Sequence, residues 1–182
     1  MTVNDSRFAD LYDRYYGHVY AYCRRRVPLD RVEDAVADTF LTVWRRIEDV
    51  PEGEEALLWL YRVSYRVAGH VWRASSRARR LETKLLSLGM ETHPPAEDFV
   101  ITTQDEEQVV AAAARLTGKD EEVLRLAIWE HLTNRQIASI LSIGEGAVKQ
   151  RLHRAKKSLT REYNRLETKR TKSHAAQKGG AW

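Results

Sequence analysis

Cysteines, clustered histidines and long apolar runs are scarce in this 182-residue chain, and each shortage excludes a class of protein. A single cysteine, Cys23, excludes an internal disulfide and cannot build a zinc site by itself. The six histidines show no metal-ligand spacing, so we predict no metal site and no cofactor. No apolar run approaches the roughly 20 residues needed to cross a bilayer, so we expect no insertion into a membrane.

The motifs of common catalytic sites are also missing. There is no phosphate-binding glycine loop and no nucleophile elbow, and Cys23 lies on an apolar face where a small buried residue is expected. The N-terminus is polar and acidic and has no charged-then-apolar signal sequence. We therefore predict a cytoplasmic protein that is not an enzyme.

The distribution of charge is more informative than its sum. The formal net charge is only +4, yet residues 62–84 hold seven Lys or Arg and one acid, whereas residues 91–107 hold six acids and no Lys or Arg. After Gly146 basic residues dominate again. Two cationic segments joined by an acidic connector predict two separate contacts with a polyanion.

Helical periodicity runs through nearly every segment and strand-like alternation is almost absent, which predicts an all-α fold of two small helical bundles joined by a flexible acidic linker. The first bundle spans residues 5–85 and contains three helices. The first of these ends near Pro28, and Asp30 with Glu33 has the form of a capping box that opens the second. The apolar face of the second helix is predicted to comprise Val32, Val36, Phe40, Val43, Trp44 and Ile47.

A linker is predicted at residues 86–104, which include two consecutive prolines and scattered acids. The second bundle spans residues 105–166. Its first helix, at residues 109–116, is expected to break at Thr117-Gly118, and Asp120 to cap the next. The tail at residues 167–182 has no periodicity and is predicted to be disordered and basic.

Residues 133–159 read as a helix-turn-helix. Thr133 is a good N-cap for a helix over residues 134–141, and Ser142 to Gly144 form a turn in which Gly144 can take a positive φ. The second helix sets an apolar stripe against a cationic face, as a helix in a DNA major groove requires. Taken alone, the motif leaves a solvated basic helix pair as the alternative. The stripe consists of Val148, Leu152, Ala155 and Leu159.

Four stretches, in a common order and covering nearly the whole chain, resemble segments of extracytoplasmic-function (ECF) sigma factors, the minimal class of bacterial RNA polymerase specificity subunits. The family's polymerase-binding helix is similar to VEDAVADTFLTVWRR of this chain. The family's next helix, which engages the −10 promoter element, is similar to ALLWLYRVSYRVAGHVWR. The fourth-region domain is resembled by LTGKDEEVLRLAIWEHLTNRQIASIL and its recognition helix by GEGAVKQRLHRAKKSL.

This resemblance implies a subunit that recruits core RNA polymerase to promoters, recognises the −35 element as duplex and the −10 element as single strand, and promotes melting. Many relatives are held inactive by an anti-sigma protein, so an anti-sigma protein is a candidate partner of this chain. The alternative is a polymerase-independent helix-turn-helix regulator, whose N-terminal bundle would serve dimerisation or ligand sensing. Such a regulator would bind duplex tightly alone.

The resemblance also assigns residues to three surfaces. Base edges of the −35 element would be read by Lys149, Gln150, His153 and Arg154, and its phosphates held by Thr133, Arg135, Arg151, Lys156 and Lys157. The −10 strand would contact the acidic loop, residues 48–55, and the basic helix that follows it. The residues assigned to this contact are Glu52, Gly53, Glu54, Trp59, Arg62, Arg66, Arg73 and Arg77. Polymerase would dock on Glu33, Asp34, Asp38, Thr39, Phe40 and Leu41.

Some residues of the −10 and polymerase surfaces have simpler structural explanations. Trp59 and Phe40 are expected mainly as core aromatics. Acidic residues in the first turn of a helix, such as Glu33 and Asp34, also favour the helix dipole without any partner.

Overall fold

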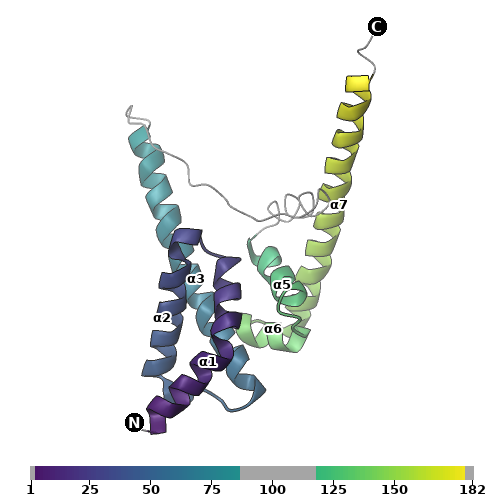
Figure 1. Cartoon of the computed structure of the whole chain (residues 1–182). Coiled ribbons are helices and arrows are strands. Elements are labelled where there is room, and N and C mark those ends of the chain that lie inside the picture. The colour runs from purple at the N-terminus through teal and green to yellow at the C-terminus, as the bar shows by residue number, and fades with distance from the viewer. Residues whose placement is uncertain (1–2, 87–117, 179–182) are drawn as a thin grey trace. The chain divides into compact units, whose positions relative to one another are not determined.

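The computed structural model describes residues 3–86 and 118–178, with side chains described for residues 3–74, 118–165 and 168 (Figure 1). Every regular element in these ranges is a helix, which confirms the predicted all-α fold. The chain divides between Asp98 and Phe99 into two compact units, here called the N-terminal and C-terminal units. Apart from Leu86, the expected linker lies outside the described residues, as does the helix expected at residues 109–116.

The N-terminal unit is a three-helix bundle in which each long helix packs against the other two. Within the described residues its elements are α1 (Val3–Arg24), η1 (Leu29–Arg31), α2 (Val32–Arg45), η2 (Ile47–Asp49) and α3 (Glu54–Leu86). Apolar residues at helical spacing meet in the middle, where each large side chain removed from water contributes about 1.5–3 kcal/mol. The fully buried members include Val19, Tyr22, Cys23, Val43 and Leu60.

The predicted capping box at the start of α2 is wrong. The helix begins at Val32, and its N-cap, Arg31, makes no side-chain capping hydrogen bond. Pro28 precedes a 3-10 turn closed by the Arg31 N–H donating to the Pro28 carbonyl at 2.9 Å. Proline has a fixed φ and here precedes the 3-10 turn at Leu29–Arg31, so Asp30 lies inside that turn and not at the N-cap of α2.

The described part of the C-terminal unit contains α5 (Gly118–Ile128), α6 (Asn134–Leu141) and α7 (Glu145–Lys178), with α6 and α7 forming the predicted helix-turn-helix. Thr133 is the N-cap of α6, and with Gln136 it completes a capping box: the Gln136 N–H donates to the Thr133 hydroxyl, and the Thr133 N–H to the Gln136 side chain. The predicted cap is confirmed. The unit's core includes Val123, Leu124, Leu126, Ile137, Ile140, Val148 and Ala155.

The turn between α6 and α7 uses Ser142, not Gly144, as its left-handed residue. Ser142 has φ 53° at the C-cap of α6, a position where helices commonly end in the left-handed conformation. Gly144 instead lies immediately before α7, and its carbonyl accepts hydrogen bonds from the N–H groups of Ala147 and Val148 at 3.0 and 3.2 Å. The positive φ predicted for Gly144 is therefore wrong.

Two helix ends in the C-terminal unit also differ from the prediction. Gly118 is the first residue of α5, so Asp120 lies inside the first turn rather than at the cap. The helix α7 continues to Lys178, past the end expected near Glu167. Between Glu167 and Gly179 there is no glycine or proline, and each added helical residue gains a backbone hydrogen bond.

Candidate nucleic-acid and protein interfaces

The exposed face of α7 brings together most of the residues predicted to bind duplex DNA. Val148 and Ala155 face the core with no exposed area, which turns the opposite side of the helix to solvent. Arg135 on α6 is exposed as well, whereas Arg151 is half-buried. The structure thus places a cationic surface on a helix anchored by its apolar stripe. Its exposed members on α7 are Lys149, Gln150, His153, Arg154, Lys156 and Lys157.

Arg154 has a specific partner that sequence reasoning missed. Its Nε donates to Asp120 Oδ2 at 3.1 Å and its Nη2 to Asp120 Oδ1 at 3.0 Å, a bidentate pair that joins α7 to α5. The hydrogen bonds to Asp120 and the charge of that carboxylate raise the pKa of the Arg154 guanidinium. The two residues are 34 positions apart, so no local pattern signals the pair.

The loop before α3 is held against α1. Gly53 has φ 65°, and its carbonyl accepts a hydrogen bond from the Tyr15 hydroxyl at 3.3 Å. The Arg7 guanidinium donates to the carbonyl of Val50 in the same loop. Between loop and helix lies a pocket of about 160 Å³ lined by Arg7, Asp10, Leu11, Arg14, Tyr15, Pro51, Glu52, Gly53 and Ala56.

The loop residues predicted for the −10 strand are therefore joined by α1 residues that the sequence did not reveal. Glu52, Gly53 and Glu54 are all exposed. Arg7 and Arg14 were missed because they lie some forty positions earlier in the chain, and only the tertiary fold brings them to the loop.

The basic residues of α3 follow one side of the helix. Arg66 and Arg73 are exposed and Arg62 is half-buried; at spacings of four and seven they share a helical face. Trp59 is half-buried, and the Arg46 guanidinium lies 5.8 Å from its ring centre. The Trp59 ring is therefore neither fully buried in the core nor fully exposed to solvent. The side chain of Arg77 lies outside the described residues.

The predicted polymerase-docking set divides into two groups. Glu33, Asp34, Asp38 and Leu41 are exposed on α2, whereas Thr39 and Phe40 are buried. The Thr39 hydroxyl donates to the Ala35 carbonyl at 2.8 Å, inside the bundle. The structure therefore removes the side chains of Thr39 and Phe40 from the docking face and leaves three carboxylates and one leucine on it.

Comparison with known proteins identifies both units. A model described as Sigma-70 region 2 matches residues 11–78, and one described as Sigma-70, region 4 matches residues 106–159. The ECF RNA polymerase sigma factor SigK of a Mycobacterium species is 29% identical over 151 residues, covering 80% of this chain and 77% of SigK. The ECF RNA polymerase sigma factor BldN of Streptomyces coelicolor is 27% identical, covering 85% of this chain. The chain belongs to the ECF sigma factors.

The length of the relatives varies. This sigma factor spans 59% of BldN and 40% of the probable RNA polymerase sigma factor RfaY of Xanthomonas campestris, which is 27% identical over 161 residues covering 81% of this chain.

Solved structures share the fold. CnrH in complex with the cytosolic domain of CnrY has a TM-score of 0.58 at 22% identity, covering 84% of each chain. RpoE in complex with the anti-sigma factor NepR from Bartonella quintana has a TM-score of 0.64 at 18% identity, covering 86% of this chain and 96% of RpoE. At this identity the likeness establishes the architecture and nothing finer.

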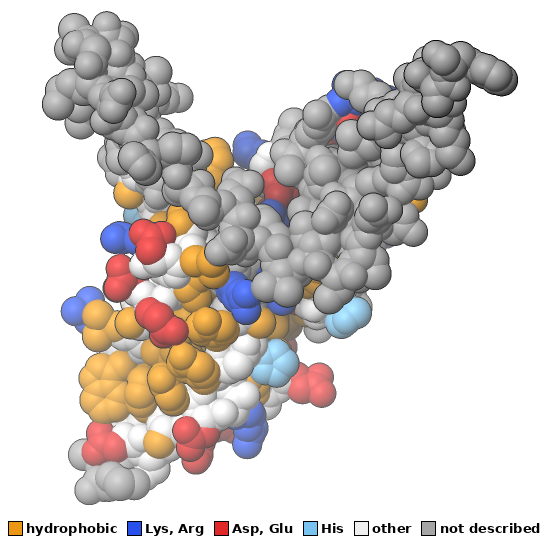
Figure 2. Space-filling view, turned by 45° about the horizontal axis from the view of Figure 1, so that its top comes forward, with side chains coloured by type: hydrophobic (Ala, Val, Ile, Leu, Met, Phe, Trp, Pro, Cys, Tyr) orange, Lys and Arg blue, Asp and Glu red, His pale blue; other side chains and the backbone are white. Residues whose placement is uncertain are grey.

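An aromatic ridge runs along α1 of the sigma factor beside the acidic face of α2. Phe8, Tyr12, Tyr16 and Tyr20 follow one another at a spacing of four, with ring centres 5.2–6.1 Å apart. Trp44, predicted on the buried face of α2, is 44% exposed and meets Phe8 edge-on at 5.2 Å. Burial and the neighbouring Glu33 carboxylate raise the pKa of Tyr16. Hydrophobic side chains gather on this unit with acidic ones at their edge (Figure 2).

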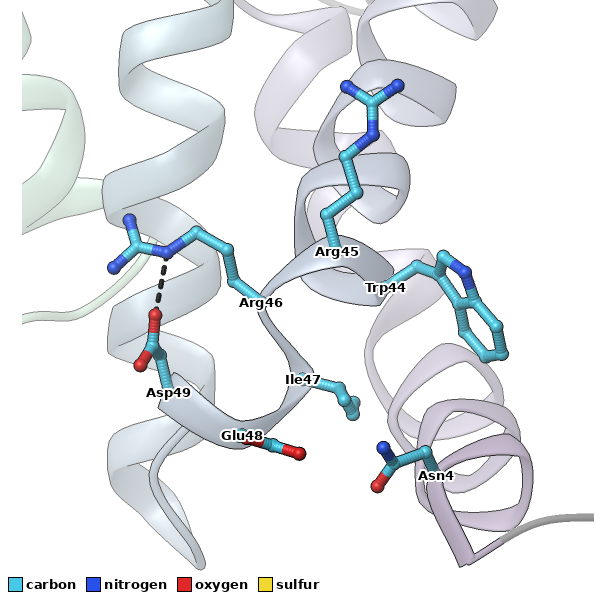
Figure 3. Close-up of a pocket in the computed structure, with 7 residues that line it drawn as sticks. All are labelled: Asn4, Trp44, Arg45, Arg46, Ile47, Glu48 and Asp49. Atoms are coloured by element: carbon cyan, nitrogen blue, oxygen red, sulfur yellow. Dashed lines mark hydrogen bonds and ion pairs between the residues drawn. The ribbon is translucent and has the colours of Figure 1, made fainter.

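A larger pocket, of about 440 Å³, opens at the C-terminal end of α2. Asn4 of α1 faces it from one side and Trp44 to Asp49 line the other, with Arg46 Nε bonded to Asp49 Oδ2 at 2.7 Å (Figure 3). Arg46 is thus tied to the start of the acidic loop on one side and lies over Trp59 on the other.

Neither a metal centre nor a membrane segment is present within residues 3–86 and 118–178. No group of three or more His, Cys, Asp and Glu side chains there is arranged to hold a metal ion. No helix in the same ranges is long and apolar enough to span a bilayer.

Proposed function

We propose that this sigma factor recruits core RNA polymerase to specific promoters, reads the −35 element as duplex with its C-terminal unit, and holds the melted −10 strand with its N-terminal unit. The observation that carries the proposal is the cationic face of α7 in a helix-turn-helix, on a chain whose other unit matches sigma-70 region 2. The protein acts in the cytoplasm, where polymerase and promoters are found.

Polymerase docks, on this proposal, on the exposed side of α2. Asp34, Asp38 and Leu41 recur at spacings of four and three and so share a helical face. Carboxylates around an exposed leucine suit a partner surface with Arg or Lys around an apolar contact, since complementary charge steers association and fixes register. The Asp34 carboxylate already lies 3.6 Å from Arg31, and a partner cation would share it.

The melted −10 strand is held at the loop before α3. An extruded base can be bound by hydrogen bonds to its Watson–Crick edge and by stacking. The pocket between α1 and the loop offers Arg7, Arg14 and Glu52 as polar groups and the Tyr15 ring as part of its wall. Arg66 and Arg73 on α3 would follow the phosphates of the same strand.

The −35 element is read by the exposed face of α7. Gln150 suits adenine, because its amide can bond N6 and N7 together, and arginine suits guanine O6 and N7. Lys156 and Lys157, further along the helix, hold phosphates with Arg135 from α6, and these contacts position the helix without specifying bases.

Regulation by a protein inhibitor is part of the proposal. Two solved relatives of the same fold are complexes, one with the cytosolic domain of CnrY and one with the anti-sigma factor NepR. An inhibitor of this kind would cover the exposed apolar and acidic surface of the N-terminal unit, and so compete with polymerase.

Copurification with core RNA polymerase, followed by transcription from a promoter library, tests the proposal. The expected result is a stable complex and initiation only at promoters that share −35 and −10 elements. Free protein should bind promoter duplex weakly, because one helix-turn-helix reads few base pairs. Nanomolar footprinting by free protein, with no affinity for polymerase, would instead establish a polymerase-independent regulator.

A further inference from the structure

The ion pair between Arg154 and Asp120 differs in kind from the other ion pairs described on α7. Lys149–Glu145 and Arg165–Glu162 each join residues within one helix, whereas Arg154–Asp120 joins α7 to α5. The Asp120 side chain is 15% exposed and the Arg154 side chain 57% exposed, so a sheltered carboxylate holds a solvent-facing guanidinium. A bidentate carboxylate fixes the plane of the guanidinium as well as its position.

The geometry of this pair leaves a defined set of donors unused by Asp120. An arginine side chain has five N–H donors: one on Nε and two on each terminal nitrogen. Asp120 takes the edge formed by Nε and Nη2. The opposite, end-on edge keeps one N–H on each of Nη1 and Nη2. That edge is the fork that matches two neighbouring acceptors, such as O6 and N7 of guanine in the major groove.

We propose that Asp120 is a positioning residue for base reading: it holds Arg154 so that the end-on fork of the guanidinium meets a guanine in the −35 element. This inference rests on the proposed function of α7. Asp120 would not touch the base itself. It would fix a long side chain before DNA arrives, so that less conformational freedom is lost on binding than with an unrestrained arginine.

A purely structural role for the pair makes different predictions. As a link between α5 and α7, Asp120 would contribute to the stability of the C-terminal unit, and its loss would weaken binding to all sequences equally. As a positioning residue, its loss would change the choice of base at one position. Its removal also takes away a negative charge near the DNA, so non-specific affinity should rise while specificity falls.

The experiment measures initiation by core polymerase with the full-length chain on promoters randomised in the −35 element. The variants are Asp120→Ala, Asp120→Asn, Arg154→Ala and the double variant Asp120→Ala/Arg154→Ala. Arg154→Ala should abolish the preference for guanine at one position. Asp120→Ala should reduce that preference roughly two- to tenfold, with smaller effects elsewhere, as expected when one long side chain must be ordered on binding. The double variant should match Arg154→Ala.

Glu145→Ala serves as the matched control, because it removes an acid that pairs with Lys149 on the exposed side of the same helix. It should leave the guanine preference governed by Arg154 unchanged. Urea unfolding of each variant reports stability separately.

An Asp120→Ala variant that is less stable but has unaltered base preference would overturn the inference, as would equal relaxation at every position. A wild-type protein that selects no −35 sequence with polymerase would overturn the proposed function and this inference together.

Discussion

The Tyr15 hydroxyl donates a hydrogen bond to the carbonyl of Gly53, 3.3 Å away, and so ties the first helix to the loop that precedes α3. Gly53 has φ 65°, a conformation that glycine adopts without strain, so this backbone position favours glycine. The bond closes one side of the pocket proposed for an extruded −10 base. The shape of that pocket thus depends on a residue 38 positions earlier in the chain.

Removing this bond should weaken promoter opening while leaving the −35 contact intact. We expect Tyr15→Phe to lower the free energy of unfolding of the N-terminal unit by about 0.5–1.5 kcal/mol, the net value of one hydrogen bond. Permanganate reactivity of unpaired thymines should fall in the open complex with core polymerase. Tyr12→Phe removes a hydroxyl from the same helix at a more exposed position and is the control. Equal opening by both variants would contradict the proposed role of the loop pocket.

Charge reversal on α2 should separate docking from folding. Asp38→Lys should weaken binding to core polymerase, because it places a cation where the partner is expected to present Arg or Lys. Asp13→Lys makes the same change of charge at an exposed position on α1 and should leave affinity nearly unchanged. Helical content by circular dichroism should be equal in both. If Asp38→Lys binds polymerase as wild type does, the docking face is wrongly assigned.

Burial raises the pKa of the Cys23 thiol to about 11, against an ordinary value of 9.0, although the nearby Arg26 acts in the opposite direction. Below pH 9 both the folded and unfolded chains keep this proton, so the contribution of Cys23 to stability is fully present. Between pH 9 and 11 only the unfolded chain loses it, so the contribution falls, by at most about 2–3 kcal/mol.

The pH dependence is checked by urea unfolding of wild type and Cys23→Ala at several values between pH 8 and 11. The difference in unfolding free energy between the two proteins should shrink as the pH rises, because other titrating groups are common to both. In the folded protein the thiol should also react slowly with thiol reagents at pH 8, since the thiolate is the reactive form. A constant difference between the two proteins across this range would show that Cys23 is not desolvated.

The helices themselves were predictable because their signals are local. The bounds of α6 at Asn134 and Leu141 agree with the prediction, since Thr133 and Gln136 lie within one turn of each other and cap the helix by themselves. Apolar spacing likewise identified Cys23, Val32 and Val36 as core residues.

Contacts between distant residues could not be predicted in this way. Arg154 was predicted to read a base, but its bidentate pairing with Asp120 depends on how α5 packs on α7. Trp44 was predicted as buried from its spacing, yet it lies at the edge of the bundle, where only the packing of α1 decides how much of the ring is covered. The spacing of apolar residues shows which side of a helix faces the core. It does not show how far the neighbouring helix extends over that side.

Gln150 and Lys157 should separate the two kinds of DNA contact on α7. Both are exposed on the side away from the core, but Gln150 lies near the start of the helix and Lys157 about two turns later. A glutamine amide can make two bonds to an adenine edge, so Gln150→Ala should cost roughly 1–3 kcal/mol at one −35 position and relax the choice of base there. Initiation on the randomised −35 library measures this.

Lys157→Ala should instead weaken binding to all −35 sequences alike. A lysine that neutralises one phosphate releases about 0.9 counterion, so the slope of log affinity against log salt should become shallower by roughly that amount. Gln150→Ala should leave the slope unchanged, because it removes no charge. A selective loss for Lys157→Ala, with a uniform loss for Gln150→Ala, would mean that α7 lies in the groove further along its length than proposed. The salt series and the promoter library together decide between these two placements.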